Sequence, residues 1–384
     1  MSHQVLLYEG ETAHDITNRC YKISTTRGRE SLVDEIDPGS LLLAVRNQDR
    51  AFDPPFTGAT PGVFGAMTPG RKVVVKDGAV TVFTGLTHHY RPMWDDDGNA
   101  NVSIDAFDAL GPLATTDLVE HTADVYDRPG ERIGKMLDRA EVGYPDGVSF
   151  RDLDAGLNPL QGDEVRAETK ALDYAQLATR SDLGRFFASR TNVLTYRDRY
   201  SNRGVSAAAS FGTGGIPVHK VRVRFGDDLH REVAVSREGG VDQVARNQTA
   251  IDANPELGVR RLRFGPTITN SDAYSAAFSS FLLDEYSELK PVVSGLVVVL
   301  NKLSVSDRAS VAGLEINDLA DFAFTPNNVG DPVSQTSVVE GIRYDVDTNS
   351  RQVTMTFHLT EAVDLSDYFV IGTDLIGGPK VIGF

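Results

Sequence analysis

The first third of the chain shows short aliphatic and β-branched runs separated by turn residues. The runs are 41–45, 73–75 and 80–83, with turn residues at 37–39 and 76–79. Residues 88–93 and 101–106 flank an acidic turn at 95–99, a pattern that predicts a hairpin. Strands at this rhythm favour an antiparallel sheet or small barrel, so we assign residues 1–112 to a first β-barrel domain.

The pattern changes to helical spacing after residue 112. Two segments carry apolar residues three and four positions apart: Ile133, Met136, Leu137 and Ala140 in the first, and Ala171, Tyr174, Ala175 and Ala178 in the second. Pro129 suits the first turn of the first helix, and Gly143 suits its end. We therefore expect residues 113–200 to form an inserted α+β domain.

Residues 183–199 predict a β-hairpin that packs against the second helix. Runs 184–188 and 193–197 are rich in aromatic and β-branched residues, and Asn192 in the intervening turn tolerates a left-handed backbone. Phe186, Phe187 and Tyr196 are candidates for the core of this domain. An interface patch is the alternative for the same three aromatic residues.

The rest of the chain returns to strands. Residues 201–215 are small and polar and predict a linker, while 221–225 and 233–235 alternate so that one face of each is buried. The segment 216–236 is a candidate to complete the first barrel. A long helix is predicted over 271–290, between Asn270 as N-cap and Pro291, followed by strands at 292–300, 342–346 and 353–359. We assign 237–384 to a second β-barrel domain with this one long helix.

Charge and composition narrow the possible partners. The 384 residues include 54 acidic and 38 basic side chains, a formal net charge of −16, which argues against nucleic-acid binding by the whole molecule. The longest apolar run, 292–300, is too short to cross a bilayer, so we expect no membrane insertion. Cys20 is the only cysteine, which excludes an intrachain disulfide.

The sequence offers no catalytic, cofactor-binding or metal-binding set. His88 and His89 stand near the acidic turn, but a calcium loop starting at Asp95 would need Gly and Glu where Ala100 and Ala106 occur. Residues 212–215 are glycine-rich without the lysine of a phosphate-binding loop. No hydrolase motif is present, and the scattered carboxylates show no apolar context that would raise a pKa. We expect a protein that is not an enzyme.

Three stretches resemble the minor tail proteins, or baseplate hub proteins, of long-tailed bacteriophages. They are the opening, at 24–29, 37–39 and 45–54; the hairpin at 183–199 with its preceding helix; and the closing ribbon across 347–350. In that family the hairpin turn usually carries Asp-Gly, so Asn192 departs from the pattern. The resemblance implies an α+β, mainly β fold with two tube-protein-like antiparallel β-barrel domains and an α+β domain between them.

The resemblance also implies a role in the virion. Such proteins form a ring, expected here to be a homotrimer, that joins the tail tube and distal tail ring to the central fibre or spike. The expected partners are the distal tail, tube, tape measure and fibre or spike proteins. The protein would be made in the host cytoplasm and assembled at the tail tip, where DNA passes through a net negative channel without specific binding.

Four arginines in the resembling stretches are candidates for a subunit interface: Arg27, Arg29, Arg46 and Arg50. Their guanidinium groups could pair with acidic side chains of a neighbour, and the alternative is that they are exposed on edge loops. Two other functions stay open. One is a tail-associated cell-wall hydrolase, which needs a paired-carboxylate or zinc site. The other is a receptor-binding module that recognises sugar through exposed aromatic residues.

Overall fold

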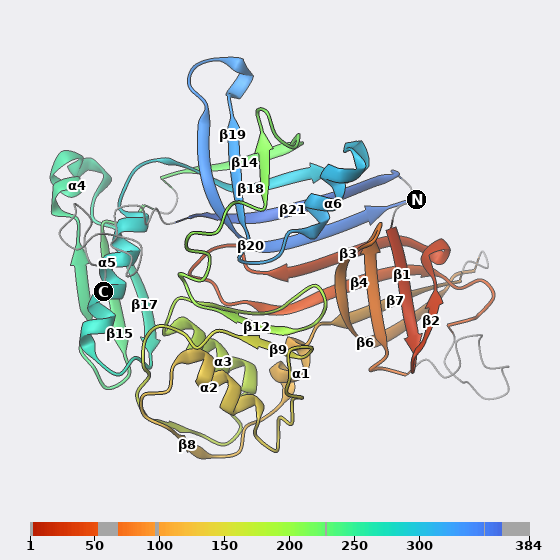
Figure 1. Ribbon diagram of the computed structural model, residues 1–384, viewed down its shortest axis with the longest axis horizontal. Helices are drawn as coiled ribbons and strands as arrows, with labels where there is room; N and C mark the ends of the chain where they lie inside the picture. Colours follow the sequence, from red (N-terminus) through yellow and green to blue (C-terminus); the bar gives the residue numbers. More distant parts are fainter. Residues whose placement is uncertain (1–2, 53–67, 97–99, 227–228, 349, 363–384) are drawn as a thin grey trace.

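A single large β-sheet dominates the molecule (Figure 1). The computed structural model describes residues 3–52, 68–96, 100–226, 229–348 and 350–362. Eleven strands follow one another across the 13-stranded sheet in this order: β14 (Lys220–Phe225), β18 (Pro291–Val299), β21 (Gln352–Glu361), β20 (Val333–Asp347), β3 (Cys20–Gly28), β4 (Asp37–Arg46), β7 (Ala100–Phe107), β6 (Val80–Trp94), β5 (Lys72–Asp77), β1 (His3–Glu9) and β2 (Thr12–Asp15). Of the other two strands, β19 (Leu319–Phe324) pairs with β20, and β13 (Ala209–Gly212) pairs with β19.

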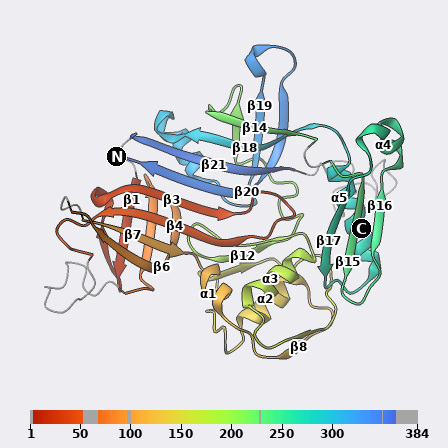
Figure 2. The same ribbon diagram turned by 180° about the vertical axis from the view of Figure 1, so that it is seen from behind.

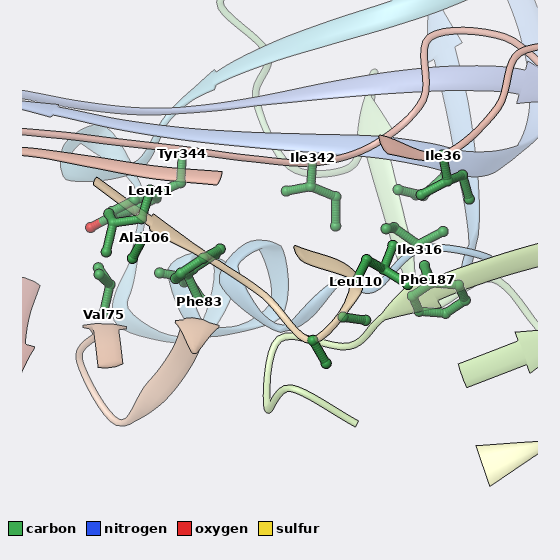
Figure 3. Close-up of a cluster of buried hydrophobic side chains, with 14 of the residues drawn as sticks. Ile36, Leu41, Val75, Phe83, Ala106, Leu110, Phe187, Ile316, Ile342 and Tyr344 are labelled. Carbon is green, nitrogen blue, oxygen red and sulfur yellow. The ribbon is translucent and has the colours of Figure 1, made fainter. Parts of the chain in front are cut away.

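A strand from the N-terminal half of the chain meets a strand from the C-terminal half in the middle of this sheet. Strand β3 pairs with β20 in an antiparallel ladder from Gly28 and Gly341 to Lys22 and Asp347. The N-terminal strands therefore lie on one side of the β3–β20 seam and the C-terminal strands on the other. Both halves contribute to one core, in which side chains of β4, β5, β6, β7 and β20 meet those of α1 and β11 (Figure 3).

The α+β domain covers one side of the sheet (Figures 1 and 2). Its helices are α1 (Leu110–Thr115), α2 (Pro129–Leu137) and α3 (Ala171–Arg180), and its strands are β8 (His121–Ala123), β9 (Arg151–Leu153), β10 (Asp163–Val165), β11 (Arg185–Ala188) and β12 (Leu194–Arg197). The predicted hairpin is confirmed, since β11 pairs with β12 and Asn192 has a φ of 71°. The predicted stripe of α3 is buried, whereas α2 ends at Leu137 and leaves Ala140 exposed.

A smaller unit stands at one end of the molecule (Figure 2). It contains a three-stranded sheet in the order β16 (Gln243–Arg246), β15 (Glu232–Arg237) and β17 (Arg261–Thr267). Helix α5 (Asp272–Tyr286) packs on β15 and β16, and the short helix α4 (Gln248–Ala253) follows β16 in the sequence. Val233 and Val235 of β15 pack with Phe278 and Leu282 of α5 in a core separate from the main one. The N-cap of α5 is Ser271, one residue later than predicted. The remaining helix, α6 (Val305–Gly313), packs against β6.

The prediction of an α+β, mainly β protein is confirmed, with differences in how the strands join. The described strands form no closed barrel, because the path of paired strands ends at β2 and β14. Segment 216–236 does not complete the N-terminal half: β14 pairs with β18, and β15 belongs to the small unit. Part of the predicted linker, residues 209–212, is the strand β13.

The predicted buried face of β14 holds only at its start, where Val221 is partly buried against the main core. Val223 and Phe225 are 46% and 61% exposed. The ladder between β14 and β18 shifts register between Arg222 and Val223, so the side chains that follow the shift exchange faces. Alternation in the sequence does not reveal such a bulge.

Prediction from the fold. Phe186 and Phe187 are 1% and 2% exposed and belong to the main core. Replacing either with Ala should destabilise the protein by about 3 to 5 kcal/mol, measured by chemical denaturation, because each substitution opens a large cavity. Phe225→Ala, at the exposed end strand, is the matched control and should change the stability by less than about 0.5 kcal/mol. Equal free energies of unfolding for all three variants and the parent would contradict this packing.

Candidate functional site

The most extensive buried charge network lies where the hairpin meets the β3–β20 seam. Glu340 of β20 is fully buried, and its carboxylate accepts hydrogen bonds from Arg29 Nε at 2.8 Å and from Arg185 Nε at 3.1 Å. Arg29 follows β3, and Arg185 opens β11. One carboxylate thus joins the N-terminal segment, the α+β domain and the C-terminal segment.

Local backbone geometry brings these groups together. The ladder between β20 and β21 shifts register between Val339 and Gly341, and such a bulge changes the direction of the intervening side chain, here Glu340. Gly28 has a φ of 87°, and a Cβ there would lie 2.2 Å from the carbonyl oxygen of Glu340. A Cβ on Gly341 would lie 2.5 Å from the Arg29 carbonyl oxygen. Both glycines are therefore required for the close approach of the chains.

The electrostatics of Glu340 follow from its two partners. Burial alone would raise the pKa of this carboxyl, because it penalises the charged form. The guanidinium groups of Arg185 and Arg29 outweigh burial and hold the pKa of Glu340 at about 2. The carboxylate is therefore ionised across the neutral range and well below it.

A second carboxylate fastens the tip of the hairpin. Glu315, between α6 and β19, accepts a 2.5 Å bond from Arg27 Nη1 and a 2.8 Å bond from the backbone nitrogen of Arg190. The Asn192 side chain accepts from the Ala109 backbone nitrogen at 2.7 Å, next to α1. The hairpin is thus held at its base by Glu340 and at its tip by Glu315 and Asn192. We call these contacts together the junction network.

The four predicted interface arginines separate into two pairs. Arg27 and Arg29 are buried and form ion pairs with Glu315 and Glu340 of the same chain, so they are not exposed to a neighbouring subunit. Arg46, at the end of β4, and Arg50, in the following turn, are exposed. A sequence signal did exist for Arg27, because it shares the alternation of the buried residues Ile23 and Thr25 in β3.

The histidine and glycine candidates do not assemble into a site. His88 and His89 are exposed with their Nδ1 atoms 2.9 Å apart, and the described residues contain no cluster of three metal-ligating side chains. Residues 97–99 of the acidic turn lie outside the described residues. Residues 212–215 form a turn with positive φ at Gly212 and Gly214. No helix in the described ranges is long and apolar enough to cross a membrane.

Several carboxyl groups have environments that were not predicted from sequence: burial raises the pKa of Asp108 to about 7 and that of Asp182 to about 6. Glu285 of α5 and Glu361 of β21 line the same cleft, and burial together with the charge of Glu361 raises the pKa of Glu285 to about 7. Lys290 Nζ lies 2.6 Å from the Glu361 carboxylate. The expectation that no carboxylate has a raised pKa is therefore wrong. The signal was present, since Glu285 continues the apolar helical spacing of Phe278, Phe281 and Leu282.

Comparisons with known proteins identify the fold. The sequence matches no protein-family model and no curated protein. Two solved structures match nearly end to end. The 43 kDa tail protein of prophage MuSo2 from Shewanella oneidensis matches with a TM-score of 0.62 and 13% sequence identity, over 94% of this chain and 98% of that protein. The tail protein from Neisseria meningitidis MC58 matches with a TM-score of 0.61 and 10% sequence identity, over 94% of this chain and 97% of that protein. The E. coli c3393 protein matches less closely, with a TM-score of 0.50 and 10% sequence identity, over 90% of this chain and 74% of that protein. It is a type VI secretion component described as structurally similar to the T4 bacteriophage tail proteins gp27 and gp5.

The chain therefore has the fold of phage tail proteins. The expected resemblance to them is confirmed at the level of structure, over nearly the whole length of two such proteins. Sequence identity this low shows the fold alone, and the role of the chain is a separate inference.

Prediction from the junction network. Glu340→Gln should destabilise the protein by about 3 to 5 kcal/mol in chemical denaturation, since it leaves two buried guanidinium groups without their counter-charge. Asp117→Asn, which removes a half-exposed ion pair with Lys170 away from the β3–β20 seam, is the control and should cost at most about 1 kcal/mol. Similar losses of unfolding free energy in the two variants would show that the ion pairs of Glu340 contribute no more to stability than an exposed pair.

A comparison of the parent protein with Glu340→Gln at different pH values gives a second test of the junction network. Glu340 binds its proton more weakly when folded (pKa about 2) than at its ordinary value of 4.5, so its contribution is complete above 4.5 and is lost as pH falls toward 2. The stability advantage of the parent over Glu340→Gln should shrink across that window. An advantage that stays constant down to pH 2 would contradict the assignment.

Proposed function

We propose that this chain is a structural subunit of a bacteriophage tail tip. It would form a hub ring that joins the tail tube and distal tail ring to the central fibre or spike and encloses the channel through which DNA leaves. The observation that carries the proposal is the match of the fold, over 94% of this chain, to two tail proteins of nearly the same extent. The assembly would be a homotrimer in contact with distal tail, tube, tape measure and spike proteins.

The ends of the large sheet support a head-to-tail ring. Strand β14 carries Lys220, Arg222 and Arg224, whereas the β1–β2 hairpin at the other end carries Glu9, Glu11 and Asp15. End strands present backbone groups on which another chain can pair, and opposite charges favour contact between unlike ends. A contact between two different surfaces closes into a ring when the rotation per subunit allows it.

The net charge of −16 fits a channel for DNA. A basic lining would hold the polymer at its phosphates, since duplex DNA carries one negative charge per about 1.7 Å. We propose that the channel-facing surface is net negative and that Arg46 and Arg50 face protein neighbours. In that position they would pair with carboxylates across the subunit contact.

A cell-wall hydrolase is the second candidate function, because Glu285 has the raised pKa that a general acid needs. A structural subunit should release no soluble fragments from purified host cell wall. Release by the parent protein that is lost in Glu285→Gln would overturn the structural assignment. Release that persists in Glu285→Gln would point to contamination by another enzyme. Any release that depends on this cleft should also change in Lys290→Ala, because Lys290 pairs with Glu361 beside Glu285.

Prediction from the proposed ring. Arg46→Glu combined with Arg50→Glu should reduce the yield of complete tails at least about tenfold when the variant gene complements a phage that lacks this protein, because like charges would then meet at the contact. Arg166→Glu combined with Arg203→Glu, an equal charge change at two exposed residues, is the control and should assemble normally. A normal yield of tails from the double variant would show that Arg46 and Arg50 do not lie in the subunit interface.

A further inference from the structure

The small unit joins the large sheet beside the cleft that contains Glu285. The chain enters the small unit after β14 and leaves it after α5, before β18. Both connecting segments line the cleft, with Gly226 and Leu229 from the first and Glu288 and Lys290 from the second. The cleft has a volume of about 90 Å³, and the end of β21 lines it as well. A change in this cleft therefore changes how the small unit meets the sheet.

The Glu285 side chain lies in this cleft without a counter-charge of its own. It belongs to the last turn of α5, is partly buried, and forms no hydrogen bond or ion pair with a described residue. Three other carboxylates act on the same space: Glu361 and Glu288 line the cleft, and Glu340 contributes its charge from β20. An ionised Glu285 thus adds a second negative charge beside Glu361, and like charges at this distance repel.

The basic groups around Glu285 do not neutralise it. They are Lys290, Arg224 and His230 in this cleft, and Arg185 and Arg199 in the neighbouring pocket. Lys290 acts most strongly on Glu285, but its Nζ lies 2.6 Å from the Glu361 carboxylate. Arg185 is paired with Glu340, and the His230 ring packs edge-on against Tyr286. No described basic group forms an ion pair with Glu285 itself.

The rest of α5 is held by the α+β domain. Just before its first turn, the backbone N–H of Ile268 donates to Ser181 Oγ at 2.9 Å, and its carbonyl oxygen accepts from the Gln161 N–H at 2.8 Å. Further along, the Arg199 guanidinium lies 4.7 Å from the centre of the Phe278 ring. The last turn, at Glu285, can therefore move away from β21 while the start of the helix stays in place.

We propose that the last turn of α5 and the end of β21 form a pH-sensitive contact that sets the position of the small unit. With the Glu285 carboxyl protonated the cleft stays closed, and with the carboxyl ionised its repulsion from Glu361 opens the cleft. The inference does not depend on the tail assignment or on the ring, since it rests on contacts within one chain.

The pH range follows from the environment of Glu285 in the closed cleft. Burial, and then the charge of Glu361, raise its pKa from the ordinary value of 4.5 to about 7. Opening the cleft removes both causes, so the closed form binds the proton more tightly. Its advantage is complete below pH 4.5, falls as pH rises to 7, and changes no further above that. The ratio of open to closed molecules should rise at least about tenfold between pH 5 and pH 8.

Distances between two spin labels test the movement in the full chain. Val241→Cys places one label on the small unit and Val305→Cys places the other at the start of α6; both positions are exposed, and the buried Cys20 stays unlabelled. Double electron–electron resonance should show one distance distribution at pH 5 and an additional, displaced population at pH 8. A second pair, Val241→Cys with Val329→Cys, measures the same movement from another direction.

Three carboxyl-to-amide variants assign the response to its source. Glu285→Gln should keep the pH 5 distribution at pH 8, because the amide cannot ionise. Glu361→Gln should do the same, since it removes the repelling charge and leaves Lys290 free to pair with Glu285. Glu288→Gln, at an exposed carboxylate of the same cleft, is the matched control and should respond like the parent.

Two results would overturn the proposal. One is a parent protein whose distances, in both label pairs, are the same at pH 5 and pH 8. The other is a shift that persists in Glu285→Gln, which would assign the pH response to another group such as His230.

Discussion

Glu340 is the point at which three distant parts of the chain depend on one another. Its partners come from residue 29, before the α+β domain, and from residue 185, inside it, while Glu340 itself lies near the end of the described chain. A buried charge is costly unless it is paired, so leaving any one of the three groups in place without the others is unfavourable. The junction network therefore favours a fold in which all three segments are present, in one register.

This constraint fastens the α+β domain to the seam of the large sheet. Strands from both halves share the β3–β20 seam and one core, and the α+β domain is fastened to that seam through its hairpin. The end strands β2 and β14 then lie at opposite ends of a single sheet.

Local patterns predicted the elements well and their partners poorly. The hairpin at 183–199, the helix α3 and the closing ribbon follow from alternation, helical spacing and turn residues, all of which act within a few positions. The continuity of β3 with β20 rests on contacts between residues more than 300 positions apart, for example Ser24 Oγ with Asp345 at 2.6 Å, and no local pattern contains it. For the same reason Arg29 gave no sign of its buried partner Glu340. Arg27 and Glu285 were different, because each continued an apolar periodicity that could have indicated burial.

An averaged image of the assembled tail tip, at a resolution that distinguishes this fold, tests the account most directly. The proposed function predicts three copies in a closed ring around the channel, with the β14 end of each sheet next to the β1–β2 end of its neighbour and net negative charge toward the lumen. A single copy, a ring of another order, or the absence of this chain from the tip would contradict it.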